Sequence, residues 1–452
     1  MKNSSFFFYE NWLRNGFHWK SPYHDIAFRA ATKLFPSAAH LLLDHGFLTR
    51  AADLLSSSSS NAKLLTAQAR VAYLSGDHAS ATAYSFAALD SRTDAADQRR
   101  VVKLLARISP NELIAWLDRG DKHDLALRIR AARDDAETGG LLFPQPTGDE
   151  RLLNANRNRN SAEKLFILNS FWEEMGLSSI KLRSDTPEFD INCFLNSRAD
   201  HQVSLAETAD VSVVMAVHNG APYIESSCMS ILNQLGILSE LIVIDDGSTD
   251  NTWEILEELK QRYEGRVMCK RLEQNIGTYK AKNIALKMCR REYIAFQDAD
   301  DWSHPERLST AIKWLRSDSQ NVAVTSRYVR LDKNGVFSSP AVWPIRQWSP
   351  NTLVMRRKEV IEKVGIFDEV SVGADTDYFE RIRATFGDRR INFQKEVMLI
   401  AMKLPSSLMH NKTTGISQNG YSAPRIAYRE KSAERLLHCI SHRRDPHHDN
   451  LL

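Results

Sequence analysis

The sequence lacks the features of secreted, membrane-spanning and nucleic-acid-binding proteins. It has only five cysteines in 452 residues and no C-x-x-C pair, which argues against a disulfide framework or a zinc site. No apolar run approaches the roughly 20 residues of a membrane span, and polar residues interrupt the aromatic opening MKNSSFFFYENW too soon for a signal peptide. A net charge of +3 is too small to indicate a nucleic-acid partner. We expect a cytoplasmic protein, and attachment to the inner face of a membrane stays open.

Residues 1–150 show the apolar spacing of helices throughout. Turn glycines recur at Gly46, Gly76 and Gly120, and small residues such as Ala81 follow where helices must approach closely. The pattern resembles tetratricopeptide-type helical hairpins with an uneven period, and a plain helical bundle fits equally well. The region has no convergent set of catalytic residue types, so we expect an interaction domain that binds a protein partner or the acceptor.

The pattern weakens between about residues 139 and 210. The stretch LLFPQPTGDERLLNANRNRNS contains Pro, Gly and Asn and is interpreted as a linker or surface loop, and the helix AEKLFILNSFWEEMGL follows it. We therefore assign residues 151–208 to a linker with one connecting helix. Residues 209–430 form the next domain, and the His-rich residues 431–452 are interpreted as a solvated tail.

From Val211 the chain alternates between strands and helices. The runs VSVVMAV and ELIVIDD have the β-branched composition and length of buried parallel strands, and VMCKRLE and YIAFQDAD continue the series as the third and fourth strands. Helical stretches separate these runs. The sequence predicts an α/β domain with a doubly wound sheet.

Polar residues gather where these predicted strands end, the edge at which such sheets bind ligands. His218-Asn219 follow the first strand, Asp245-Asp246 the second, and Asp298-Ala299-Asp300-Asp301 the fourth. The dinucleotide fingerprint G-x-G-x-x-G and the phosphate loop G-x-x-x-x-G-K-[ST] are both absent. A carboxylate-rich edge needs a divalent cation if a phosphate is to approach. A helix N-cap before Pro305 is the alternative for the last cluster, although one aspartate suffices for a cap.

Five blocks in this part of the chain, in this order, resemble the signatures of the inverting family 2 glycosyltransferases. The resemblance covers about residues 209–387 and implies a GT-A fold, a nucleotide-sugar donor and a divalent metal, Mn²⁺ or Mg²⁺. The blocks are VSVVMAVHNGAPYIESSCMSILNQ, ELIVIDDGSTDNTWEIL, NIGTYKAKNIAL, YIAFQDADDWSHPERL and VGIFDEVSVGADTDYFERI.

The resemblance also implies roles for particular residues. Asp298 and Asp300 match the outer members of the D-x-D motif, with Asp300 the expected direct metal ligand, and Asp298 also contacts the nucleotide. A late histidine often ligates the metal in such enzymes, and His410 is the candidate here. The other residues that the resemblance places at the nucleotide are Ala216, His218, Asn219, Asp246, Lys282 and Asn283.

Asp375 matches the catalytic aspartate of the family. An inverting transfer displaces the nucleoside diphosphate in line, so a carboxylate must take the proton of the attacking hydroxyl. A helix cap is the alternative role for Asp375, and both roles can coexist. The chain departs from the family pattern at His218, where Tyr is common, and at Ala374, where Glu is usual.

These observations predict a metal-dependent transferase that moves a sugar from a nucleotide sugar, with UDP the expected nucleotide, to a saccharide or lipid-linked saccharide. Bacterial surface polysaccharide synthesis, such as capsule or O-antigen, is the natural setting for the family. The alternative is a non-catalytic nucleotide-binding protein with a degenerate transferase domain. A nucleotidyltransferase fits less well, because its Gly-rich start with a basic residue is missing.

Overall fold

The structure is a computed structural model in which the chain forms two compact units. One unit contains Met1–Lys122 and Pro405–Leu452, and the other contains His123–Leu404. The structure describes residues 43, 48–56, 64–91, 95–133, 143–158, 160–183, 189–195, 211–340, 342–404, 407, 415–417 and 420–442.

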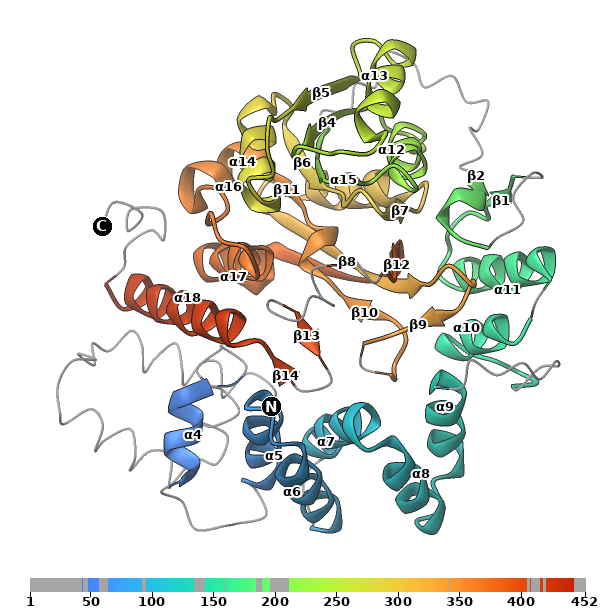
Figure 1. Ribbon diagram of the computed structural model, residues 1–452, viewed down its shortest axis with the longest axis vertical. Coiled ribbons are helices and arrows are strands. Elements are labelled where there is room, and N and C mark those ends of the chain that lie inside the picture. Colours follow the sequence, from blue (N-terminus) through green and yellow to red (C-terminus); the bar gives the residue numbers. More distant parts are fainter. Residues whose placement is uncertain are drawn as a thin grey trace. The chain divides into compact units, whose positions relative to one another are not determined.

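The described part of the first unit is helical apart from one short β-hairpin. Helices α5 and α6 pack against each other across a tight turn, in which Gly76 adopts a φ of 84° and the Asp77 carboxylate accepts a hydrogen bond from the Ser80 N–H at 3.0 Å. This confirms the predicted helical region, whereas the tetratricopeptide-like repeat stays a prediction. The elements are α4 (Leu48–Ser56), α5 (Leu65–Leu74), α6 (His78–Asp90), α7 (Ala95–Ile108), α8 (Pro110–Arg119), β13 (Ile416–Ser417), β14 (Gly420–Tyr421) and α18 (Ala423–His442) (Figure 1).

The second unit is built on a ten-stranded mixed sheet with the order β5-β4-β3-β6-β11-β8-β12-β7, and β9 and β10 both pair with β8. Strands β3 to β6 are parallel, as the sequence predicts, and β11 runs antiparallel to β6. The strands are β3 (Val211–Val217), β4 (Ser239–Asp245), β5 (Val267–Arg271), β6 (Tyr293–Phe296), β7 (Asp301–Ser303), β8 (Ala323–Leu331), β9 (Phe337–Ser338), β10 (Gln347–Trp348), β11 (Val354–Arg356) and β12 (Ile391–Met402), with β1 (Lys181–Leu182) and β2 (Phe194–Leu195) in a separate pair.

Helices accompany this sheet along its length. They are α9 (His123–Arg133), α10 (Asp149–Asn156), α11 (Ser161–Glu173), α12 (Ile224–Leu232), α13 (Thr252–Arg262), α14 (Thr278–Met288), α15 (Arg307–Ser317), α16 (Arg357–Val364) and α17 (Ala374–Phe386), with the 3₁₀ turns η1 (Ile191–Cys193), η2 (Pro350–Thr352) and η3 (Asp388–Arg390).

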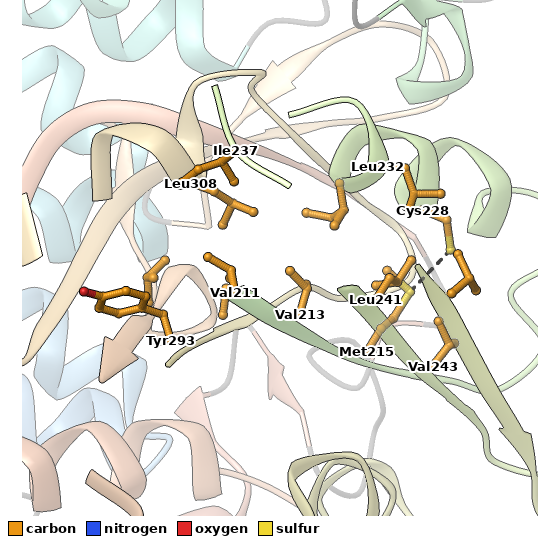
Figure 2. Close-up of a cluster of buried hydrophobic side chains, with 14 of the residues drawn as sticks. Val211, Val213, Met215, Cys228, Leu232, Ile237, Leu241, Val243, Tyr293 and Leu308 are labelled. Carbon is orange, nitrogen blue, oxygen red and sulfur yellow. Dashed lines mark hydrogen bonds between the residues drawn. The ribbon is translucent and has the colours of Figure 1, made fainter. Parts of the chain in front are cut away.

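One core of the second unit lies where α12 and α15 meet the parallel strands. Alternate residues of a strand point to the same face, so Val211, Val213 and Met215 of β3 line one surface. Figure 2 shows these side chains with Leu232 of α12 and Leu308 of α15, all of them buried. This packing fixes the strands, and thereby the direction in which their carboxyl ends project their loops.

A second core joins α10 and α11 to strands β7, β8, β9 and β12 of the sheet. Trp172 of α11 is almost fully buried, its ring centroid lies 5.9 Å from that of Trp302 on β7, and its indole N–H donates to the Val397 carbonyl at 3.1 Å. Leu152 and Leu153 of α10 belong to the same core.

This packing corrects the expected domain boundaries. The interpretation of residues 141–161 as a linker or surface loop was wrong for α10, whose polar residues Asp149, Glu150 and Asn154 are buried. The Asp149 carboxylate pairs with Arg346 and accepts a hydrogen bond from the Ile345 N–H at 2.9 Å. Residues 151–208 therefore contribute, in their described part, to the α/β unit, whose first residue is His123 rather than a residue near 209. The segment 431–452, expected as a tail, is helical as far as His442 in α18.

The Trp172 core predicts a large stability difference between two aromatic positions on one helix. Trp172→Ala leaves a cavity beneath the sheet and should lower the free energy of unfolding by about 3–5 kcal/mol. Phe166→Ala, also on α11 but at a side chain that is 75% exposed, should change it by no more than about 0.5 kcal/mol. Urea denaturation followed by circular dichroism measures both, and equal effects would contradict this packing.

Candidate functional site

The carboxyl ends of β3, β4 and β6 bring three polar loops to one edge of the sheet. The loops after β3 and β4 are tied together, because the Asn219 N–H donates to the Ser248 hydroxyl at 2.9 Å and the Thr249 N–H donates to the Asn219 amide oxygen at 2.8 Å. Asn219 adopts a φ of 53° to make these contacts. Ala216 is half-buried, whereas His218 and Asn219 are exposed at the edge.

Asp246 fixes the loop that leads into α14. One carboxylate oxygen accepts a hydrogen bond from the Ile276 N–H at 2.7 Å and the other from the Gly277 N–H at 2.9 Å. Gly247 lets this loop come close, since a Cβ there would lie 2.7 Å from the Gln274 backbone. The nucleotide contact expected for Asp246 stays a prediction, and the described contacts give this residue an architectural role.

Helix α14 places a positively charged lysine side chain beside the predicted metal motif. The Lys282 ammonium lies 2.7 Å from one carboxylate oxygen of Asp298, and the Asn351 amide donates to the other oxygen at 2.6 Å. Burial alone would lower the pKa of Lys282, but the Asp298 carboxylate outweighs it and raises this pKa above its ordinary value. Lys282 therefore stays charged and neutralises part of the acidic cluster.

Asp300 and Asp301 add two further carboxyl groups to the cluster, and the pKa of each is raised. Burial, and then the neighbouring Asp298 carboxylate, raise the pKa of Asp300 to about 6. Burial and the charges of Asp300 and Asp298 also raise the pKa of Asp301 well above its ordinary range. Within the described residues no group of three or more His, Cys, Asp or Glu side chains is arranged to hold a metal. A cation at this edge would need ligands beyond the protein carboxylates.

Asp375 lies in the first turn of α17 and contacts α14. A single carboxylate oxygen of Asp375 accepts both a hydrogen bond from the Tyr279 hydroxyl at 3.1 Å and one from the Thr376 N–H at 2.8 Å. Burial, and then the Asp375 charge, raise the pKa of Tyr279 well above its ordinary value, so this phenol remains a donor. Tyr279 and Lys282 are three residues apart and share one face of α14. That face contacts both the candidate base and the D-x-D motif.

Two other polar residues near the site are occupied by structural contacts. The Asn283 amide pairs with both the N–H and the carbonyl of Phe367, at 3.0 and 2.9 Å, and its side chain is buried. Asp377 forms a fully buried ion pair with Arg381 at 2.8 Å. The nucleotide contact expected for Asn283 stays a prediction, and its amide is already paired with backbone.

One predicted site residue lies outside the described part of the chain, and two residues of the site were not predicted. His410 lies outside the described residues, so its role as a metal ligand stays a prediction. Sequence reasoning missed Tyr279 and Asn351. The spacing of Tyr279 from Lys282 was a usable signal, but Asn351 is 53 residues from Asp298 and no motif marks it.

Known proteins resemble the part of the chain that contains these residues. Residues 212–375 match Glycosyl transferase family 2. The chain is 33% identical over 132 residues to the Escherichia coli UDP-Glc:alpha-D-GlcNAc-diphosphoundecaprenol beta-1,3-glucosyltransferase WfaP, with 29% of this chain and 51% of that protein covered. It is 34% identical over 109 residues to the putative teichuronic acid biosynthesis glycosyltransferase TuaG of Bacillus subtilis, with 24% and 43% covered.

A solved structure of S. aureus TarS in complex with UDP is similar at 20% identity and a TM-score of 0.37, covering 50% of this chain and 69% of that chain. The chain spans about half the length, or less, of the two curated relatives named above. Residues 212–375 thus resemble the family 2 glycosyl transferases, and the predicted α/β domain with a helical region before it is confirmed. No helix in the described part of the chain is long and apolar enough to cross a membrane.

The raised pKa of Asp300 predicts how stability depends on pH. At pH values below 3.8, the ordinary value for this group, the carboxyl is protonated in both folded and unfolded chains. As the pH rises through about 6, the folded protein must release the proton into an unfavourable site, and this cost persists at higher pH. Asp300→Asn should therefore raise the melting temperature of the metal-free protein by a few degrees at pH 7.5.

The gain should shrink towards zero as the pH approaches 4, because the wild-type carboxyl is then protonated as well. Thermal unfolding in chelator at several pH values measures this dependence. Glu258→Gln, which removes an exposed carboxylate from α13, is the control for net charge. The same gain in both variants, or a gain that does not vary with pH, would contradict the raised pKa of Asp300.

Proposed function

We propose that this protein is an inverting, metal-dependent glycosyltransferase that moves a sugar from a UDP-sugar to a hydroxyl of a saccharide or lipid-linked saccharide. The observation that carries the proposal is the shared face of α14. Through it, Lys282 contacts Asp298 at 2.7 Å and Tyr279 contacts Asp375 at 3.1 Å. One helix thus connects the acidic cluster suited to a diphosphate with a carboxylate suited to proton transfer.

The acidic cluster fits a hard divalent cation. Mg²⁺ and Mn²⁺ prefer oxygen ligands, and Mg²⁺ commonly uses one or two carboxylates together with substrate phosphates. Asp298 and Asp300 supply such carboxylates, and the raised pKa of Asp300 marks negative charge that its neighbours do not fully compensate. When bound, the cation would neutralise charge on the departing diphosphate. His410 is a further candidate ligand.

The residues of the chain account for the rest of the transfer. The acceptor oxygen forms a bond to the anomeric carbon while the bond from that carbon to the diphosphate oxygen breaks, and the electron pair leaves with the diphosphate. Asp375 takes the proton of the acceptor hydroxyl. Its contacts to Tyr279 and Thr376 use one carboxylate oxygen, and no contact found in the described residues uses the other. Tyr279 orients the base, and Lys282 offsets charge beside the leaving group.

Two relatives support the biological setting. The name of WfaP gives UDP-Glc as donor and a diphosphoundecaprenol-linked sugar as acceptor, and that of TuaG gives teichuronic acid biosynthesis. We infer a role in bacterial surface polysaccharide synthesis, such as capsule or O-antigen, on the cytoplasmic side of the membrane. The helical unit would bind a protein partner or the acceptor.

A non-catalytic nucleotide-binding protein is the second candidate, because Ala374 stands where the family usually has Glu. Alanine has no polar side-chain atom, and Ala374 is completely buried, so this position offers a substrate no polar side chain. Turnover separates the two functions, since the second predicts nucleotide binding without transfer or donor hydrolysis.

Nucleotide binding tests the acidic cluster. We expect UDP to raise the melting temperature more with Mn²⁺ or Mg²⁺ present than with chelator, because the cation links the carboxylates to the diphosphate. Asp300→Ala should abolish this difference, whereas the surface variant Glu258→Gln should keep it. Equal stabilisation by UDP in chelator would rule out the metal.

Replacement of the base tests the chemistry. Asp375→Asn keeps the size of the side chain but cannot accept the proton, so transfer or donor hydrolysis should fall roughly a hundredfold or more. UDP affinity by calorimetry should stay unchanged, because the substitution lies on the acceptor side of the reaction.

Asp377→Asn is the matched comparison, two residues along the same helix. It leaves the buried Arg381 without its anionic partner and should cost about 3–5 kcal/mol of stability. Full transfer by Asp375→Asn would exclude Asp375 as the base.

A further inference from the structure

Two large aromatic side chains are exposed side by side in the second unit. Trp348 of β10 is 38% exposed and Phe393 of β12 is 42% exposed. Their ring centroids lie 6.5 Å apart, and each ring also contacts Phe379 of α17, at 4.9 and 5.8 Å. Phe379 itself is buried. We call these three residues the aromatic platform.

The sheet holds the platform in place. Strands β10 and β12 flank β8, where Trp348 pairs with Arg327 and Phe393 pairs with Thr325. Thr325 and Arg327 are two residues apart and therefore share a face of the sheet. The Trp348 indole N–H donates to the Thr325 hydroxyl at 2.9 Å. The polar edge of the indole is thus satisfied, and its orientation is fixed while more than a third of the residue stays exposed.

The platform adjoins both halves of the candidate catalytic site. Trp348 comes three residues before Asn351, whose amide donates to Asp298 at 2.6 Å. Phe379 lies four residues after Asp375 on α17, so the two share one face of the helix at about 5–6 Å between Cβ atoms. Elements that hold the metal motif and the base therefore also support the exposed rings.

We propose that the aromatic platform binds a pyranose ring of the saccharide acceptor, next to the sugar whose hydroxyl is attacked. This inference rests on the proposed function and adds to it a subsite for one sugar ring of the acceptor. One face of a pyranose presents C–H groups, and these pack against the electron-rich face of an aromatic ring. An apolar surface with a few placed polar groups is the usual composition of such sites.

Arg327 supplies a polar group at the edge of the platform. It is the cross-strand partner of Trp348, so both side chains leave the sheet on the same face. Within the described residues no hydrogen bond or ion pair of its guanidinium is found, and the residue is half-buried. Its donors are free for the hydroxyl groups of a sugar that rests on the indole.

Direct binding of simple sugars tests the platform without turnover. Saturation-transfer NMR on the full chain, with methyl glycosides of glucose, galactose and N-acetylglucosamine at millimolar concentration, should show transfer to the C–H protons of at least one glycoside. Trp348→Ala should reduce that signal at least fivefold, and Trp348→Phe, which keeps a ring, should retain part of it. Phe166→Ala removes a more exposed aromatic on α11 and should leave the signal unchanged.

UDP affinity separates this inference from the proposed function. Trp348→Ala should bind UDP with Mn²⁺ as the wild type does, and in a transfer assay it should raise KM for the acceptor about tenfold or more with donor hydrolysis unchanged. No signal from any glycoside with the wild type, or the same signal from Trp348→Ala, would overturn the platform even if UDP binds. A parallel loss of UDP affinity in Trp348→Ala would also overturn it, because the ring would then be structural.

Discussion

The ion pair between Lys282 and Asp298 is the contact around which the site is arranged. The lysine side chain is only 5% exposed, so its charge is taken out of water, and the Asp298 carboxylate at 2.7 Å compensates for that loss. Asp300 and Asp301 follow two and three residues after Asp298 and would concentrate negative charge without the Lys282 ammonium. Because Lys282 belongs to α14, the packing of that helix on β3 and β4 places the ammonium beside the acidic cluster that follows β6.

Much of the α/β unit could be predicted because its pattern is local. Buried parallel strands are short β-branched runs, and β3, β4 and β6 fall where VSVVMAV, ELIVIDD and YIAFQDAD predict them. The edge with the polar loops follows from the parallel order alone. Asp298 and Asp375 come together with α14 at that edge, as expected for residues that follow strands or begin helices there.

The parts that sequence reasoning missed depend on contacts between distant residues. Helix α10 contains Asp149 and Asn154, which are typical of a loop, but both are buried and hydrogen-bonded to residues that only the fold brings close. Asn351 reaches Asp298 from a segment without a motif. The structural role of Asn283 could not be predicted, because its side chain pairs with the backbone of Phe367. Any residue type at position 367 would offer the same backbone groups, except that proline lacks the N–H.

The segment between α16 and α17 is hydrogen-bonded to both helices of the candidate site, α14 and α17. The Arg381 guanidinium of α17 donates hydrogen bonds to the carbonyls of Val364 and Ile366. The Asn283 amide of α14 donates to the carbonyl of the next residue, Phe367. The separation of the base from the acidic cluster therefore depends on two buried side chains, Arg381 and Asn283, that hold the main chain of this segment. Surfaces formed by side chains alone are free to diverge. In a lineage of such proteins, new acceptors could be acquired through surface substitutions while the reaction itself is inherited unchanged.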